Sequence, residues 1–220
     1  MGLVGDLSGA RVRDELVAIL SEERVGGALA RIAGIGLAGA LHPAIECGEP
    51  AVALVERLDA ARNRYAPDLA AWRGRLGAMA RAIPGDELDA WLERLRVRRR
   101  DARVVAAAAV VPPRLQSPLE RAEEPARVAE LLAAQPVEVA LMVLAGGGRA
   151  AEQAEIYLER LRAVRLDIDG DTLRQQFGMQ ESPLIGEVLA ELLRRRRNGE
   201  LGGREQQLEA ARELLAEVAG

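Results

Sequence analysis

The chain has 220 residues, of which 49% are hydrophobic, 29% are charged and 2% are aromatic, and its formal net charge is −4. This composition excludes a disordered chain, and no apolar run approaches the ~18 residues of a membrane span. One cysteine, Cys47, and one histidine, His42, exclude an intrachain disulfide and a Cys/His metal cluster. We expect a cytoplasmic protein with no export signal in residues 1–6 and no membrane partner.

Apolar residues recur at helical spacing along nearly the whole chain, and alternating strand-like runs are almost absent. The sequence therefore predicts an all-α protein, a multi-helix bundle with no sheet. Ser8 is expected to cap a first helix that buries Leu16 and ends near Gly26 and Gly27. A short helix and a tight turn are expected within residues 34–43.

Prolines mark the predicted starts of the next helices. Pro50, Pro67 and Pro84 stand 17 residues apart, and each is placed like the first residue of a helix of about four turns. Pro112 and Pro113 are expected to close the small, apolar and ambiguous segment 102–111, because proline breaks helices.

The last third of the chain continues the helical pattern. Pro125 and Pro136 are expected to start two helices, and Gly146-Gly147-Gly148 is expected to form a flexible joint. Further helices are predicted from Arg149, from Ser182-Pro183 and over residues 204–218. Joints near residue 48 and at the glycine triplet divide the chain into residues 1–48, 49–145 and 146–220.

Two arginine clusters are the strongest candidates for a binding site. All 30 basic residues are arginines, and six of them lie with a single aspartate in residues 94–103. The first cluster contributes Arg98, Arg99, Arg100 and Arg103. The second contributes Arg194, Arg195, Arg196 and Arg197. Forked, permanently charged guanidinium groups suit phosphate binding.

A purely structural interpretation of both clusters stays open. Arginines in the last turn of a helix also stabilise the helix dipole, and the second cluster has Glu187, Glu191 and Glu200 close by. Five aromatic residues are too few for a row of base-stacking platforms. Any nucleic acid would therefore be held by its backbone and shape.

Other residues do not form a recognisable catalytic site. Asp167 and Asp169 follow the glycine triplet as in two-metal nucleotidyltransferases, but an amphipathic helix intervenes, so we expect Asp169 or Asp171 to cap a short helix. His42 is expected to be structural. The glycine triplet lacks the Lys-Ser/Thr of a phosphate-binding loop. We predict no catalytic residue and no metal ligand on this chain.

Two blocks of sequence carry motifs that go beyond helical periodicity. The N-terminal block contains Leu7-Ser8-Gly9-Ala10-Arg11 and Leu41-His42-Pro43, and the C-terminal block contains Asp167-Ile168-Asp169-Gly170-Asp171-Thr172-Leu173, Ser182-Pro183-Leu184-Ile185-Gly186 and Asn198-Gly199-Glu200-Leu201. Both blocks resemble the helical C-terminal region of bacterial tRNA nucleotidyltransferases and poly(A) polymerases. The N-terminal block resembles the family's neck helix and the turn after it. In the C-terminal block, Ser182 stands where the family has glycine.

The resemblance implies a neck over residues 1–48, a helical body over 49–145 and a tail over 146–220. In the family this region grips the acceptor and T arms of tRNA, so RNA, and tRNA in particular, is the expected partner. The resemblance also implies that the catalytic head is missing, and that the chain is inactive without a covalently or non-covalently associated head. Mg²⁺ and ATP or CTP would belong to that head, and no cofactor is expected on this chain.

A second hypothesis remains open beside RNA binding. The chain could be a helical protein-interaction or dimerisation scaffold whose arginine-rich turns are only helix ends. The sequence does not distinguish CCA addition from poly(A) addition, because the two differ in the missing part.

Overall fold

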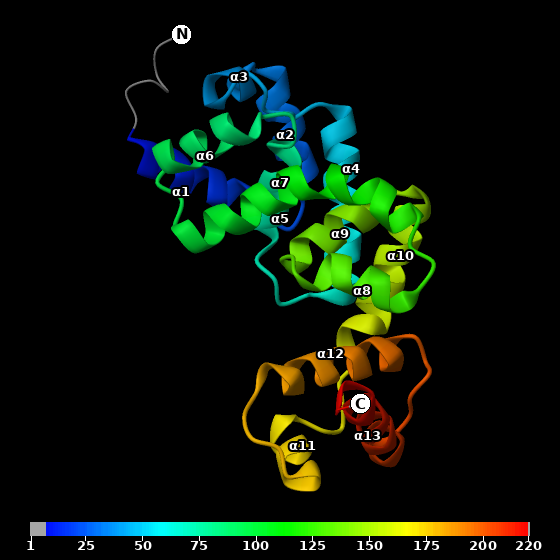
Figure 1. The fold of residues 1–220 in the computed structure, drawn as a ribbon. Helices are drawn as coiled ribbons and strands as arrows, with labels where there is room; N and C mark the ends of the chain where they lie inside the picture. The colour runs from blue at the N-terminus through cyan, green and yellow to red at the C-terminus, as the bar shows by residue number, and fades with distance from the viewer. Residues whose placement is uncertain (1–7, 220) are drawn as a thin grey trace. The chain divides into compact units, whose positions relative to one another are not determined.

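The computed structural model describes residues 8–219, so the expectation about an export signal in residues 1–6 and the match at Leu7 lie outside the described part. The all-α prediction is confirmed, because residues 8–219 contain helices and no strand (Figure 1). The helices are α1 (Gly9–Ile19), α2 (Val25–Gly34), α3 (Leu37–Leu41), α4 (Glu49–Tyr65), α5 (Ala71–Met79), α6 (Gly85–Arg94), α7 (Arg99–Glu120), α8 (Pro125–Ala133), α9 (Val137–Gly146), α10 (Gly148–Glu159), the short 3₁₀ turn η1 (Leu161–Ala163), α11 (Gly170–Phe177), α12 (Pro183–Arg197) and α13 (Arg204–Ala219).

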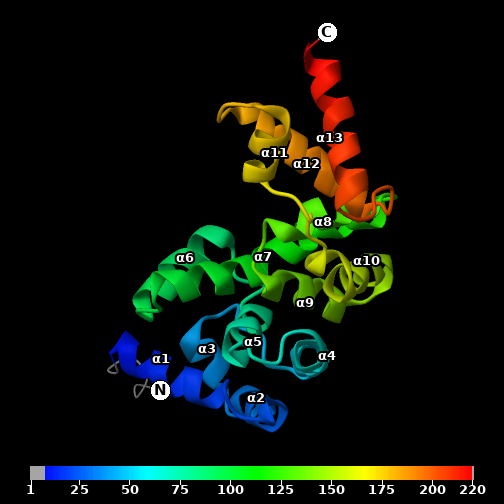
Figure 2. The same cartoon turned by 90° about the horizontal axis from the view of Figure 1, so that it is seen from below.

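The chain divides into two compact units. Unit 1 comprises the residues up to Arg121 together with Leu131–Glu155, and unit 2 comprises Ala122–Glu130 together with the residues from Ile156. Helices α1 to α7 and α9, which Figures 1 and 2 label, belong to unit 1, and α11, α12 and α13 belong to unit 2. The divisions fall directly after Arg121, inside α8 and inside α10. The three-part organisation expected from the sequence remains a prediction.

Helix α7 is the centre of unit 1. It packs against α5 and α9, and α4 packs against α5 and α9 in turn. Small residues allow the α5–α7 contact to be close. A Cβ atom added at Gly77 would lie 2.7 Å from the Ala108 Cβ and 3.2 Å from the Val105 carbonyl oxygen. These two helices therefore meet nearly backbone to backbone.

The expectation that Pro112 and Pro113 close a short segment is wrong. Helix α7 continues through both prolines and through Pro118 to Glu120. Proline removes an intrahelical hydrogen bond, so the helix has to be held by its packing. Val105, Ala108, Ala109, Leu115 and Leu119 supply that packing, because they form a continuous buried face on both sides of the prolines.

The other prolines that were expected to start helices do so with one exception. Pro50 lies in the first turn of α4, Pro125 is the first residue of α8, and Pro84 and Pro136 are the N-caps of α6 and α9. The start at Pro67 is wrong, because α5 begins at Ala71. The Arg62 guanidinium explains the delay: its Nη1 donates to the carbonyl oxygens of Pro67 at 2.9 Å and Leu69 at 3.0 Å, which holds these residues in a turn.

The first helix ends earlier than expected. Ser8 caps α1 as predicted and accepts a hydrogen bond from the Arg11 N–H, but the helix stops at Ile19, and Gly26 and Gly27 lie inside α2. The buried Arg75 fixes the turn between these helices. Its Nη1 donates to the Leu20 and Glu22 carbonyl oxygens at 2.9 and 2.6 Å, while its Nε and Nη2 each donate to Asp59 at 2.8 Å.

Unit 2 has its own core, formed where α11, α12 and α13 meet (Figure 2). Its buried members are Ile168, Leu173, Ile185, Val188, Leu192, Ala210 and Ala211. The fully buried Gln207 ties the start of α13 to the preceding loops. Its Nε2 donates to the Asp167 carboxylate at 3.0 Å and its Oε1 accepts from the Asp167 N–H at 2.9 Å.

The close α5–α7 contact predicts a strong response at Gly77. We expect Gly77→Ala to lower the free energy of unfolding of unit 1 by about 1–3 kcal/mol, because the added methyl group overpacks a close helix contact. Gly27→Ala is the matched control, since a Cβ there meets nothing within 4 Å. That change should stabilise α2 by at most about 1 kcal/mol. Urea unfolding followed by tryptophan fluorescence measures both, because Trp72 and Trp91 lie in unit 1. Equal stability of the two variants would contradict the packing argument.

Candidate nucleic-acid interface

The first arginine cluster lies where α6 ends and α7 begins. The intervening backbone is tightly constrained. Arg96 has a left-handed backbone with φ 53°, and the Arg13 Nη1 of α1 donates to its carbonyl oxygen at 2.7 Å. A Cβ atom at Gly9 would lie 1.9 Å from the Arg94 carbonyl oxygen, so α1 also touches the end of α6. Helix α1 thus fixes the path of the chain that leads into the cluster.

The cluster occupies the N-terminal end of α7. Arg98 is the N-cap with no side-chain hydrogen bond, and Arg99, Arg100 and Arg103 follow in the first turns. Positive charge is unfavourable at the N-terminus of a helix, because that end already carries a partial positive charge. The helix-end interpretation considered from the sequence therefore does not explain these four arginines.

Asp101 does not neutralise the cluster that surrounds it in sequence. Its carboxylate pairs with Arg73 of α5 at 2.8 Å. The side chains of Arg98, Arg99, Arg100 and Arg103 are exposed, and none of them forms an ion pair with a carboxylate of the described residues. The cluster and the unpaired N–H groups of the first turn together make a strongly positive surface that can bind phosphate.

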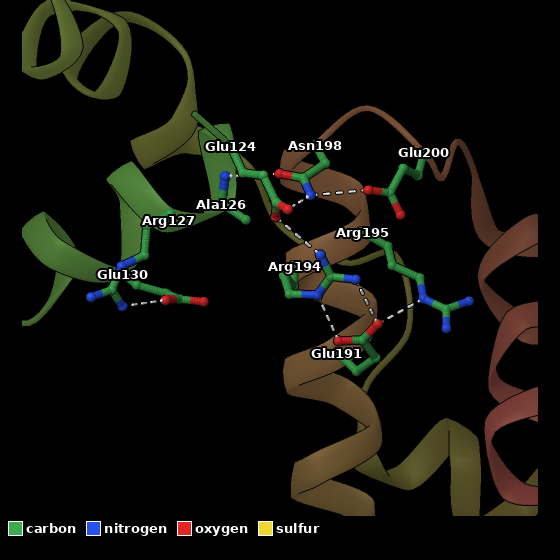
Figure 3. Close-up of polar contacts among 9 residues, drawn as sticks. All are labelled: Glu124, Ala126, Arg127, Glu130, Glu191, Arg194, Arg195, Asn198 and Glu200. Atoms are coloured by element: carbon green, nitrogen blue, oxygen red, sulfur yellow. Dashed lines mark hydrogen bonds and ion pairs between the residues drawn. The ribbon is translucent and has the colours of Figure 1, made fainter. Parts of the chain in front are cut away.

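The second arginine cluster ends α12 and is largely engaged within unit 2 (Figure 3). Arg194 donates to both oxygens of Glu191, at 2.8 and 3.0 Å, and Nη1 reaches Glu124 at 3.2 Å. Arg195 donates to the same Glu191 at 2.8 Å. Asn198 binds Glu124 at 3.1 Å and accepts from the Ala126 N–H at 2.9 Å. These contacts attach the segment of residues 122–130 to α12.

The last two arginines of the second cluster are also partly enclosed. Arg196 pairs with Asp167 at 2.9 Å and donates to the Gly202 carbonyl. Burial lowers the pKa of Arg197, and its Nε has no hydrogen-bond partner among the described residues. The second cluster therefore has less free guanidinium surface than the first. RNA binding by either cluster stays a prediction.

The remaining sequence candidates have local structural roles. Asp169 caps α11 by accepting from the Thr172 N–H at 2.9 Å, and this bond lowers the pKa of its carboxyl group. His42 accepts from the Ala44 N–H at 3.2 Å and packs edge-on against Trp91. Burial raises the pKa of the Cys47 thiol to about 11, which keeps it protonated and unreactive near neutral pH.

Sequence reasoning missed two residues that contact the first cluster or the backbone before it but lie far from it in sequence. Arg73 pairs with Asp101 across 28 positions, and Arg13 binds the Arg96 carbonyl across 83. No local pattern marks either contact.

Within residues 8–219, no group of three or more His, Cys, Asp or Glu residues is arranged to hold a metal ion. In the same residues no single helix is long and apolar enough to cross a membrane, although α8 and α9, bent by 120°, meet the length and composition test as a pair.

No family model matches the sequence, and no curated protein matches it. Solved structures do match the fold. A Thermotoga maritima CCA-adding enzyme complexed with tRNA matches over 99% of this chain and 53% of its own, with a TM-score of 0.79 and 21% identity. A CCA-adding enzyme in apo form II matches over 98% and 51%, with a TM-score of 0.76 and 20% identity. A tRNA-processing enzyme in apo form I matches over 90% and 50%, at 0.70 and 19%.

The chain thus spans about half the length of the solved structures that it matches. The resemblance found in the sequence is confirmed at the level of the fold. Structural similarity at these low identities establishes the fold and nothing finer. The helical architecture of the chain is that of about half of a CCA-adding or tRNA-processing enzyme.

The ion pairs of α12 predict a pH-dependent stability. Hydrogen bonds from Arg194 and Arg195 lower the pKa of Glu191 from 4.5 to about 2. A lowered pKa means that this stabilisation is complete above the unfolded-state value and is lost as the pH falls from about 4.5 towards about 2. We expect Glu191→Gln to lower the stability of unit 2 at pH 7 by about 1 kcal/mol and to flatten its pH dependence in this window.

Glu187→Gln is the matched control for this prediction, because Glu187 is exposed on the same helix and pairs with no described residue. An NMR titration of the Glu191 carboxyl gives its pKa directly. Hydrogen exchange of the α12 amides, corrected for intrinsic rates, gives the local stability. An ordinary pKa for Glu191, or equal effects of the two substitutions, would count against the ion-pair assignment.

Proposed function

We propose that this chain is an RNA-binding helical region that holds tRNA for a nucleotidyltransferase. The observation that carries the proposal is the exposed arginine cluster at the start of α7, whose guanidinium groups pair with no carboxylate of the described residues. Because like charges repel and the helix dipole opposes them, such a cluster costs stability in the free protein. Phosphate groups would relieve that cost.

The architecture supports tRNA as the ligand. The matched solved structures are named as CCA-adding and tRNA-processing enzymes, and one of them is complexed with tRNA. Duplex RNA is recognised mainly by its shape and its phosphates, for which a rigid helical surface with arginines is suited. Nucleotide addition would be carried out by a catalytic part outside these 220 residues, attached to this chain or associated with it.

The binding proposal is tested by titrating the full chain with tRNA at about 50 and about 200 mM salt. We expect weak binding, with a dissociation constant of about 10⁻⁴–10⁻⁶ M, that weakens steeply with salt because phosphate contacts release counterions. Undetectable binding at the lower salt, or binding that is insensitive to salt, would favour a protein-interaction scaffold.

The first cluster is tested by Arg99→Ala combined with Arg100→Ala. We expect about tenfold weaker binding and a salt slope smaller by about 0.9 for each lost phosphate contact. Arg24→Ala combined with Arg31→Ala is the matched control, because both residues are exposed in unit 1 and the charge change is the same. If both double variants bind alike, the contact lies elsewhere.

The proposed division of labour is tested by an activity assay. The full chain is incubated with tRNA, Mg²⁺ and labelled ATP or CTP. We expect no label at the RNA 3′ end, because the proposal assigns the metal and nucleotide sites to another part of the enzyme. Incorporation of label by purified protein would overturn this division.

A further inference from the structure

Helix α7 carries arginines well beyond the cluster at its start. Successive helical residues are turned by about 100°, which places three arginines of α7 and the arginine at its C-cap within about 60° of one another. These four exposed residues, which we call the α7 ridge, are Arg99, Arg103, Arg114 and Arg121. The buried residues of α7 project on the opposite side. The ridge is therefore the solvent face of the helix around which unit 1 is built.

No acidic side chain of α7 neutralises the ridge. Asp101 pairs with Arg73, and Glu120 accepts a hydrogen bond from the Gln116 Nε2 at 2.7 Å. Arg114 has no hydrogen bond or ion pair with any side chain or backbone group of the described residues. Arg121 uses only its Nε, which donates to the Ser117 carbonyl oxygen at 3.2 Å. The positive charge of the α7 ridge is thus free to bind an anionic ligand along the length of the ridge.

The surface between the arginines is small and uncharged. Ala106, Ala107, Val110 and Ser117 lie between them on or beside the same face. Arg99 and Arg121 bound a stretch of about 33 Å, because an α-helix rises 1.5 Å per residue. Small side chains let a bulky ligand approach the helix, and charges at both ends can bind it at separated points. A single bound anion would not need such a length.

The geometry points to the α7 ridge as an extended docking surface for duplex RNA, on which Arg114 and Arg121 bind phosphates beyond those held at the start of α7. This inference rests on the proposed RNA-binding function and adds to it two residues that lie far from the first cluster. Helix α7 carries no aromatic side chain on which single-stranded bases could stack. A duplex needs no stacking platform, because a protein can recognise it by its phosphates and its shape.

A structural role is the competing explanation for one of the two residues. Arg121 is the C-cap of α7, where a positive charge stabilises the helix dipole. Arg114 lies inside the helix and gains nothing from that effect. The two residues therefore need separate single variants as well as a double variant.

The test measures binding of the full chain to a hairpin RNA with an uninterrupted duplex stem. Arg114→Gln combined with Arg121→Gln is expected to weaken binding about tenfold and to lower the salt slope by about 0.9 per lost contact. Arg24→Gln combined with Arg31→Gln, which changes the net charge equally, is expected to change binding by less than about twofold. Arg114→Lys combined with Arg121→Lys keeps the charge and is expected to retain most of the binding, because the release of counterions depends on charge and does not require the guanidinium geometry.

Three results would overturn the inference. The first is a glutamine double variant that binds like its charge-matched control. The second is a loss of binding that Arg121→Gln produces by itself while Arg114→Gln has no effect, because Arg121 also has a structural role at the end of the helix. The third is equal competition by single-stranded RNA of the same length. If Arg99→Ala with Arg100→Ala still weakens binding in these cases, the proposed function stands without the ridge. Unchanged circular dichroism melting identifies variants that keep the fold.

Discussion

The near backbone-to-backbone contact of α5 with α7 is the constraint on which unit 1 depends. Gly77 and Ala108 leave no space for another carbon atom between the two helices, and that contact anchors a helix that its three internal prolines would otherwise interrupt. With one side of α7 fixed in this way, the opposite side has to face solvent. Burial on one face therefore decides where the arginines on the other face are presented.

The two units use arginine in different ways. In unit 2, Glu191 and Glu124 bind Arg194, so the guanidinium groups at the end of α12 hold neighbouring segments together (Figure 3). In unit 1, the carboxylate nearest to the cluster in sequence is bound by Arg73, and the cluster is left exposed. Identical residue types in similar runs thus have opposite surroundings, because long-range partners decide which charges stay free.

The sequence was sufficient to predict the helical class, the cap of α1 at Ser8 and the start of α12 at Pro183. It also limited the cap of α11 to Asp169 or Asp171, of which Asp169 is the residue observed. Each of these depends on short-range hydrogen bonding or on proline geometry. The continuation of α7 through Pro112 was not predictable, because packing against α5 and α9 overrides the local penalty. The same error hid the relation of Arg114 to Arg99, since residues on two separate segments would share no face. The pairing of Asp101 with Arg73 required the tertiary structure.

The three prolines of α7 have one more consequence. Each removes an amide donor, so the carbonyl oxygens of Ala108, Ala109 and Arg114 lack their usual partners four residues later. A peptide of this sequence would pay the full cost of those lost bonds without any neighbouring helix to compensate for it. The arginines of such a peptide would then not lie on one face of a helix. The spatial order of these charges belongs to the folded domain and could not be transplanted as a short linear motif.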